Sequence, residues 1–169
     1  VHTNDGYSFR VDGKKIIDEE WGTGNNWTKM LKLPICAKAG EVISASSNST
    51  YTETFYGVLT DAVVDPIIFE FDDPGTGFDT YTVPAGKKLY ITNVWAYGGG
   101  NYNSELTIDG VKIGQEPFNK PSQSSSKTLE IPLIVNSGSV VSIPDNYASF
   151  NGYLADENYF AGCGGGGSS

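Results

Sequence analysis

One short stretch of sequence occurs twice in this chain and decides its fold. It reads Phe9-Arg10-Val11-Asp12-Gly13-Lys14-Lys15-Ile16 and returns as Leu106-Thr107-Ile108-Asp109-Gly110-Val111-Lys112-Ile113. In both copies an Asp-Gly dipeptide separates two runs of residues that favour strands, and Asp-Gly is a preferred two-residue hairpin turn. The stretch therefore predicts the same β-hairpin at two places in the chain.

Two further blocks repeat behind the hairpin, in the same order. Leu33–Ser44 matches Ile131–Ser142, with a shared Pro near the start and a shared Gly in the middle, and Phe55–Asp61 matches Phe150–Asp156. The hairpin, the second block and the third block recur after 97, 98 and 95 positions. A repeat of this length is a whole domain rather than a solenoid unit. The sequence therefore predicts an all-β protein of two tandem antiparallel β-sandwich modules.

The two modules differ in completeness. We expect a truncated first module at 1–61, a complete second module at 62–156 and a flexible Gly-rich tail at 157–169. The second module has strand-like segments ahead of its hairpin, Val64–Phe71 and Tyr81–Trp95, that have no room in the first. About 35 residues, roughly three strands, are thus missing from the first module. Three explanations are open: a fragment of a longer protein, strands supplied by another subunit, or a shortened domain.

Alternating apolar residues predict the buried faces. Leu129, Ile131, Leu133 and Val135 alternate along one segment and predict a strand with a strongly buried face, and Leu31–Ala37 repeats the pattern in the first module. We expect matching core positions at Leu33, Ile35, Val42 and Leu59 and at Ile131, Leu133, Val140 and Leu154. No segment has the 3.6-residue period of a helix, so we expect no long helix.

Three motifs resemble the TNF/C1q-like jelly-roll β-sandwiches. They are the strand entry Val83–Lys87, the late turn Ser137–Val140 and the final-strand Gly152–Leu154. Gly40 and Gly138 stand where such a turn needs a positive φ. Modules of this kind occur in phage fibres and spikes and in secreted bacterial surface proteins, often as trimers. The resemblance implies jelly-roll-like modules and a structural or adhesive role.

Charge and hydropathy exclude two classes of partner. The net charge is −9, from 20 Asp and Glu against 11 Lys and Arg, and an acidic surface repels the phosphates of nucleic acid. No apolar run approaches the length of about 18 residues that suggests a membrane span. We therefore expect no nucleic-acid binding and no membrane insertion.

The residues for common enzyme chemistry are sparse. His2 is the single histidine, and Cys36 and Cys163 are the two cysteines. A zinc site needs several such ligands and a nucleophilic triad needs a placed histidine, so we predict no catalytic residues, no enzyme activity and no cofactor. Cys36 matches Ile134 of the other repeat, which predicts a buried free thiol. Cys163 lies in the Gly-rich tail, where it is available for an intermolecular bond.

Carboxylate clusters keep two weaker hypotheses open. Asp72, Asp73 and Asp79 flank a Gly-rich loop and are the candidate ligands for calcium, which prefers carboxylate and carbonyl oxygens. Their spacing does not match an EF-hand, and an interdomain hinge is the preferred interpretation. We predict no metal site and a fold that survives chelation. Paired carboxylates here and at Asp18–Glu20 keep glycoside hydrolysis as a third class of function.

Aromatic residues in or near loops are the candidate ligand-binding residues. They are Trp21, Trp27, Trp95, Tyr97 and Tyr102. Flat aromatic rings stack on sugar rings, so these side chains suit a carbohydrate. The alternative interpretation places Trp95 in the core and Trp21 or Trp27 at an interface.

Together these features predict a non-enzymatic structural or adhesive component of a virion or extracellular appendage, such as a spike, fibre or filament. We expect it outside the cell, on a cell surface or on a virion, with a cell-surface glycan or receptor as the ligand of an exposed tip. We also expect self-association, as a homo-oligomer or filament, through β-strand pairing, because an incomplete sandwich leaves an open edge. The alternative is a carbohydrate-binding module of a secreted protein.

Overall fold

The computed structural model describes residues 7–19, 33–46, 61, 63–71, 79–98, 106–114, 123–143 and 148–159. Within these residues the chain forms eleven strands and no helix, and the strands make three antiparallel sheets. The predicted all-β class is confirmed. The described part of the chain contains no helix of the length and apolar character that a membrane span requires.

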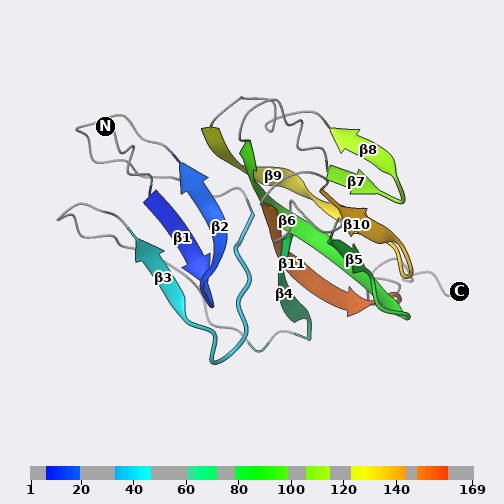
Figure 1. Ribbon diagram of the computed structural model, residues 1–169. Coiled ribbons are helices and arrows are strands. Elements are labelled where there is room, and N and C mark those ends of the chain that lie inside the picture. The colour runs from blue at the N-terminus through cyan, green and yellow to red at the C-terminus, as the bar shows by residue number, and fades with distance from the viewer. Residues whose placement is uncertain are drawn as a thin grey trace, which may run out of the picture.

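A four-stranded sheet lies in the middle of the molecule (Figure 1). In spatial order it contains β4 (Asp65–Phe71), β11 (Ala148–Asp156), β6 (Lys87–Gly98) and β9 (Gln123–Val135), and we call it the middle sheet. Successive side chains of a strand point to opposite faces. Ala148, Ser149, Phe150 and Asn151 of β11 are all buried, so both faces of the middle sheet are covered.

A second four-stranded sheet covers one face of the middle sheet. Its strands, in order, are β5 (Thr80–Thr82), β10 (Val140–Ser142), β7 (Leu106–Ile108) and β8 (Val111–Gly114), and we call it the second outer sheet. The core between the two sheets contains Phe71, Val83, Leu89, Ile91, Val94, Ala96, Leu106, Val135, Val141, Ile143, Ala148 and Phe150. Full burial of one such side chain is worth about 1.5–3 kcal/mol. This pair of sheets is β-sandwich-like and holds the main core.

Aromatic rings join the strands at one edge of this core. The ring centroids of Phe69 and Tyr81 are 5.2 Å apart, and those of Tyr81 and Phe150 are 5.4 Å apart in an edge-to-face arrangement. Phe69 lies on β4 and Tyr81 on β5, so these two end strands face each other. The other end strands, β9 and β8, therefore share the opposite edge of the sandwich, as Figure 1 shows.

A three-stranded sheet covers the other face of the middle sheet, which we call the back face. Its strands, in order, are β2 (Lys14–Glu19), β1 (Tyr7–Val11) and β3 (Ile43–Ser46), and we call it the first outer sheet. A small core lies between them, made of Val11 and Ile16 from the first outer sheet and Ile68 from β4, with Phe9, Ile17, Ile35 and Ala37 packed around it. The described strands thus stack in three layers (Figure 1).

The repeated Asp-Gly turn has the same backbone structure in both copies. The φ angles of Asp12 and Asp109 are 48° and 51°, a left-handed conformation that Asp tolerates better than most residues. The Asp12 N–H donates to the Val42 carbonyl at 2.9 Å, and the Val42 N–H donates to Asp12 Oδ1 at 2.7 Å. Asp109 and Val140 make the same two hydrogen bonds at 2.9 and 2.8 Å. Both predicted hairpins are confirmed.

The two outer sheets also share strand order and register. The order β2-β1-β3 corresponds to β8-β7-β10. The residue before each Asp pairs with Ile43 in the first outer sheet and with Val141 in the second, and both hairpins shift register two residues before the turn. Gly40 and Gly138 have φ angles of 90° and 79°, as predicted. The duplication inferred from sequence therefore extends to backbone geometry.

The predicted strand is confirmed as β9, and Leu129, Leu133 and Val135 lie in or against the main core, but the prediction that Ile131 belongs to this core is wrong. Ile91 of β6 pairs with Leu133 of β9, whereas Asn93 pairs with Thr128, so residues 129–132 bulge out of the ladder. Pro132 lies in this bulge, and a proline has no N–H to donate to a neighbouring strand. Ile131 is consequently 77% exposed.

The predicted strand at 31–37 is also wrong where the structure describes it. Residues 33–38 form no strand, and Pro34 stands at the position that Pro132 holds in the second repeat. Ile35 packs against the small core, as expected, but Val42 is exposed. Leu59 lies outside the described residues.

Candidate functional site

The back face of the middle sheet carries buried polar side chains that bond to main-chain atoms of the first repeat. Asn93 Nδ2 donates to the carbonyl of Ile16 at 2.7 Å, and the Ser149 hydroxyl donates to the carbonyl of Lys15. Both polar side chains are buried. β2 is an end strand of the first outer sheet, so no neighbouring strand pairs with its outer edge. Side chains of the middle sheet donate hydrogen bonds to its main-chain carbonyls instead.

Asn151 makes a two-way contact with the segment that follows β2 in the chain. The Cys36 N–H donates to Asn151 Oδ1 at 2.9 Å, and Asn151 Nδ2 donates to the Cys36 carbonyl at 2.8 Å. A neighbouring strand would offer an extended chain the same pair of hydrogen bonds. Here a single side-chain amide makes both of them. Since a buried polar group without a partner costs about 1–3 kcal/mol, the pair fixes both partners in place.

Two lysines of β2 complete the contact. Lys14 Nζ donates to the carbonyl of Ile68 at 3.2 Å. Lys15 Nζ lies 4.9 Å from the centroid of the Trp95 ring, within the range of a cation–π interaction. The first outer sheet is therefore attached to the back face mainly by directional polar contacts, with Ile68 as its apolar contact.

A tyrosine pair lies on the same sheet. The rings of Tyr90 and Tyr153 are parallel within 9°, with centroids 4.9 Å apart. Burial, and secondarily the nearby Tyr90, Cys36 and Tyr159, raise the pKa of Tyr153. Burial also raises the pKa of the free, half-buried Cys36 thiol, so the thiol stays protonated at neutral pH.

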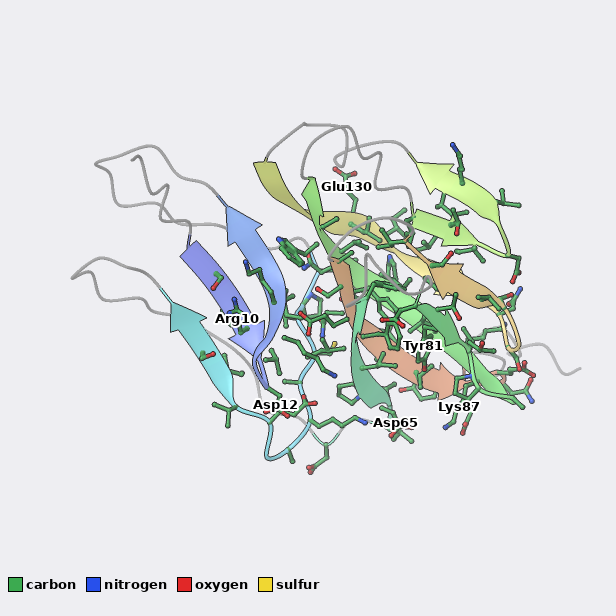
Figure 2. The ribbon with its side chains drawn as sticks, viewed as in Figure 1. Arg10, Asp12, Asp65, Tyr81, Lys87 and Glu130 are labelled. Atoms are coloured by element: carbon green, nitrogen blue, oxygen red, sulfur yellow. The ribbon has the colours of Figure 1, made fainter. Side chains whose placement is uncertain are left out.

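Ion pairs lie at one end of the middle sheet. Lys87 Nζ is 2.8 Å from Asp156 Oδ1 and 3.6 Å from Asp65 Oδ2, and Figure 2 shows Lys87 beside Asp65. The hydrogen bond to Asp156 is the main reason that the pKa of Lys87 is raised. Because these carboxylates are solvent-exposed, the cluster ties three strand ends together without providing a desolvated catalytic group.

The predicted aromatic site is only partly within the described residues. Trp21, Trp27 and Tyr102 lie outside them, and Tyr97 is described only through its backbone in β6. Trp95 is 5% exposed, with Lys15 over its ring. Among the described residues, the buried Trp95 Nε1 has no hydrogen-bond partner. Trp95 thus offers no open ring face at the surface, and the sugar-stacking hypothesis rests on the other four residues.

The candidate calcium ligands are not brought together in the described part of the structure. Asp72 and Asp73 lie outside it, and Asp79 is exposed just before β5. No group of three or more His, Cys, Asp or Glu side chains within the described residues is arranged to hold a metal ion.

Sequence reasoning missed the three residues that make the contact, Asn93, Ser149 and Asn151. A signal was present: in Ala148–Asn151 small or polar residues alternate with apolar ones in a segment that reads as a strand. Polar residues on one face of a strand usually indicate solvent. Here they face another part of the protein, and the sequence does not reveal which part.

Comparisons with protein-family models, with curated proteins and with solved structures found no match to this chain. The fold and the site define an all-β protein with stacked antiparallel sheets and a repeated hairpin unit.

Proposed function

We propose that this chain is a non-enzymatic structural or adhesive component of a virion or extracellular appendage, built from tandem jelly-roll-like β-sandwich modules. The observation that supports the proposal most is that one sheet, the middle sheet, packs against the outer sheets of both repeats. The middle sheet packs on the second outer sheet through an apolar core and on the first through side-chain hydrogen bonds. Repeated modules that share layers in this way suit a protein that sets spacing and bears load.

The back-face contacts support this proposal. Asn93, Ser149 and Asn151 bond to carbonyl and N–H groups, which every residue carries. A docking surface that recognises main chain is tolerant of sequence change in the docked module. Such tolerance suits an array in which successive modules diverge while their packing is kept.

The test is the mass and shape of the assembly. We expect the purified chain to form a defined homo-oligomer or filament by light scattering and by electron microscopy of negatively stained particles. A control sample at low protein concentration separates specific assembly from aggregation, because a closed or regular assembly dissociates by mass action. A protein that stays monomeric at every concentration would contradict the self-associating role.

A carbohydrate-binding module is the second candidate, and the tyrosines favour it. Tyr153 stacks on Tyr90 and is only half-buried, and Tyr159 is exposed. Aromatic ring faces that remain accessible to solvent can stack on sugar rings. Saturable binding on a glycan array, lost in Tyr153→Ala and Tyr159→Ala and kept in Val63→Ala, is the result expected for this function.

A further inference from the structure

The two outer sheets differ in the number of strands beyond the repeated hairpin. In the second outer sheet, β10 lies between β7 and β5. In the first outer sheet, its counterpart β3 pairs with β1 and has no neighbour on its other side within the described residues. β3 lies on the side of this sheet that is away from the middle sheet (Figure 1). We call the side of residues 40–45 that faces away from β1 the β3 edge.

The β3 edge presents main-chain groups in the same arrangement as β10. Val42 receives a hydrogen bond from the Asp12 N–H at its carbonyl and donates one to Asp12 Oδ1, so both of its main-chain groups face β1. Because these directions alternate along an antiparallel strand, Ile43 directs its N–H and carbonyl to the β3 edge. The equivalent residue of β10, Val141, pairs with Tyr81 of β5. The pairing groups that β5 uses in the second repeat are therefore open in the first.

The turn before β3 offers a second pair of groups. In the second repeat, the Val83 N–H donates to the Ser139 carbonyl and the Gly138 N–H donates to the Val83 carbonyl, each at 3.0 Å. The equivalents of Gly138 and Ser139 are Gly40 and Glu41. Gly40 has a positive φ of 90° against 79° for Gly138, so the two turns share their backbone conformation. Within the described residues, no main-chain hydrogen bond reaches the Gly40 N–H or the Glu41 carbonyl.

Apolar side chains beside this edge are uncovered in the first repeat alone. Ile43 is 38% exposed where Val141 is fully buried, and Val42 is 65% exposed where Val140 is half-buried. In the second repeat, Tyr81 lies opposite Val141 and packs against the main core. Because cross-strand partners place their side chains on the same face, an aromatic residue opposite Ile43 covers it in the same way.

We propose that the β3 edge is the acceptor site for an antiparallel strand of the β5 type. The occupant is an extended segment with the Tyr-Thr-Val-Pro-Ala-Gly pattern of residues 81–86, supplied by another module of this kind, since β5 of the same module is already paired with β10. Addition of a strand to an open sheet edge is a recurrent mode of recognition. The inference rests on the proposed function, because it names the strand that joins one module to the next.

One contact of the β5 segment has no counterpart at the β3 edge. The Ser137 hydroxyl accepts a hydrogen bond from the Gly86 N–H at 3.1 Å and donates one to the Pro84 carbonyl at 3.3 Å. Ala39, which is exposed, stands at the equivalent position. Ala39→Ser restores the hydroxyl and should tighten the binding of a β5-type strand about fivefold, the usual effect of one net hydrogen bond.

The probe is a synthetic peptide of residues 79–88, which contains β5 and the turn after it. Two control peptides carry one N-methyl group each. Because the Val83 N–H faces the β10 side, the Tyr81 N–H faces it too and the Thr82 N–H faces away. N-methylation of Tyr81 should therefore abolish binding, and N-methylation of Thr82 should preserve it. Calorimetric titration of the full-length wild type and of Ala39→Ser measures both effects.

Amide hydrogen exchange locates the bound peptide on the protein. We expect exchange to slow at Gly40 and Ile43. The proposal is overturned by a peptide that does not bind, by protection confined to β10, by equal losses from the two N-methyl groups, or by an unchanged affinity in Ala39→Ser.

The same measurements separate this proposal from the proposed function. A chain that binds the peptide as expected but stays monomeric at every concentration supports the β3 edge and contradicts the self-associating role. A chain that assembles and does not bind the peptide overturns the β3 edge, while the proposed function stands.

Discussion

The two outer sheets have nearly the same backbone geometry but pack on the middle sheet in different ways. Both contain the Asp-Gly hairpin, the same register and the same hydrogen bonds between the Asp and a Val, which is Val42 in the first sheet and Val140 in the second. Among the described residues, the second outer sheet packs on a core of twelve buried residues, whereas the small core under the first outer sheet has three. The first outer sheet compensates with side-chain hydrogen bonds to the back face. The two outer sheets therefore share their local geometry but not the packing that attaches them to the middle sheet.

This difference teaches that the middle sheet holds the two copies by different physical means. Apolar burial is non-directional and tolerates small shifts. Hydrogen bonds from Asn93 and Asn151 need an exact partner, and each loses its value when one partner is removed. We expect the first outer sheet to open at a lower free energy than the second, as a separate cooperative unit.

The largest effect should come from the residue that underlies the main core. Phe150→Ala removes a fully buried ring and should lower the free energy of unfolding by about 3–5 kcal/mol. Because Phe150 lies on β11 of the middle sheet, amide hydrogen exchange should accelerate in both outer sheets. Ile16→Ala, the matched change in the small core, should accelerate exchange in β1–β3 alone. Equal acceleration everywhere in both variants would abolish the distinction between the two layers.

Asn151→Ala should release the first outer sheet specifically. The change leaves the half-buried Cys36 N–H and carbonyl without their partner, which should cost about 1–3 kcal/mol in total. The measurement is the alkylation rate of Cys36 in a Cys163→Ser background, which should rise as the segment detaches. Asn158→Ala, an exposed asparagine in the last described turn, serves as the control and should leave the rate unchanged.

Ile131 and Val135 test the bulge that separates β9 from a regular strand. Val135 is fully buried, and its replacement by Ala should cost about 1.5–3 kcal/mol. Ile131→Ala should change stability by less than about 0.5 kcal/mol, because the side chain already faces solvent. Chemical denaturation of the two variants at a protein concentration where the chain is monomeric checks this. A loss at Ile131 equal to that at Val135 would restore the regular strand expected from sequence.

The smallest effect concerns the turn that the two copies share. The N–H of Val140, and then the Ser139 hydroxyl, hold the pKa of Asp109 below its ordinary value. A carboxyl with a lowered folded-state pKa stabilises the fold above its unfolded pKa and loses this contribution as the pH falls through the folded value. The melting temperature of the wild type should therefore exceed that of Asp109→Asn at pH 6, and the gap should close toward pH 2. A gap that is constant with pH would show that the charge contributes nothing.

Much of the secondary structure could be read from local sequence. The Asp-Gly dipeptides predicted both hairpins, and Gly40 and Gly138 predicted positive φ angles. The predicted strand at 64–71 agrees with β4 to within one residue. These features depend on the allowed φ and ψ angles of a few neighbouring residues. A short segment of sequence is therefore enough to predict them. The module boundaries at 61, 156 and 169 stay predictions.

The candidate site was not predictable in the same way. Among the predicted aromatic residues, only Trp95 has a described side chain, and it is buried. The residues that make the back-face contact were invisible because their partners lie far away in the chain: Asn93 meets Ile16 and Asn151 meets Cys36. A pattern of alternating polarity specifies that a face exists but not what lies against it.

The sequence by itself determined an all-β chain with a duplicated hairpin, because turn chemistry and strand periodicity are local properties. Only the tertiary structure decided that one sheet serves both repeats, that Ile131 is exposed and that Asn151 is buried. Exposure is a property of the layer that covers a residue. Which layer covers a residue depends on the total free energy of packing among segments that are distant in sequence. No short segment of sequence can predict that total.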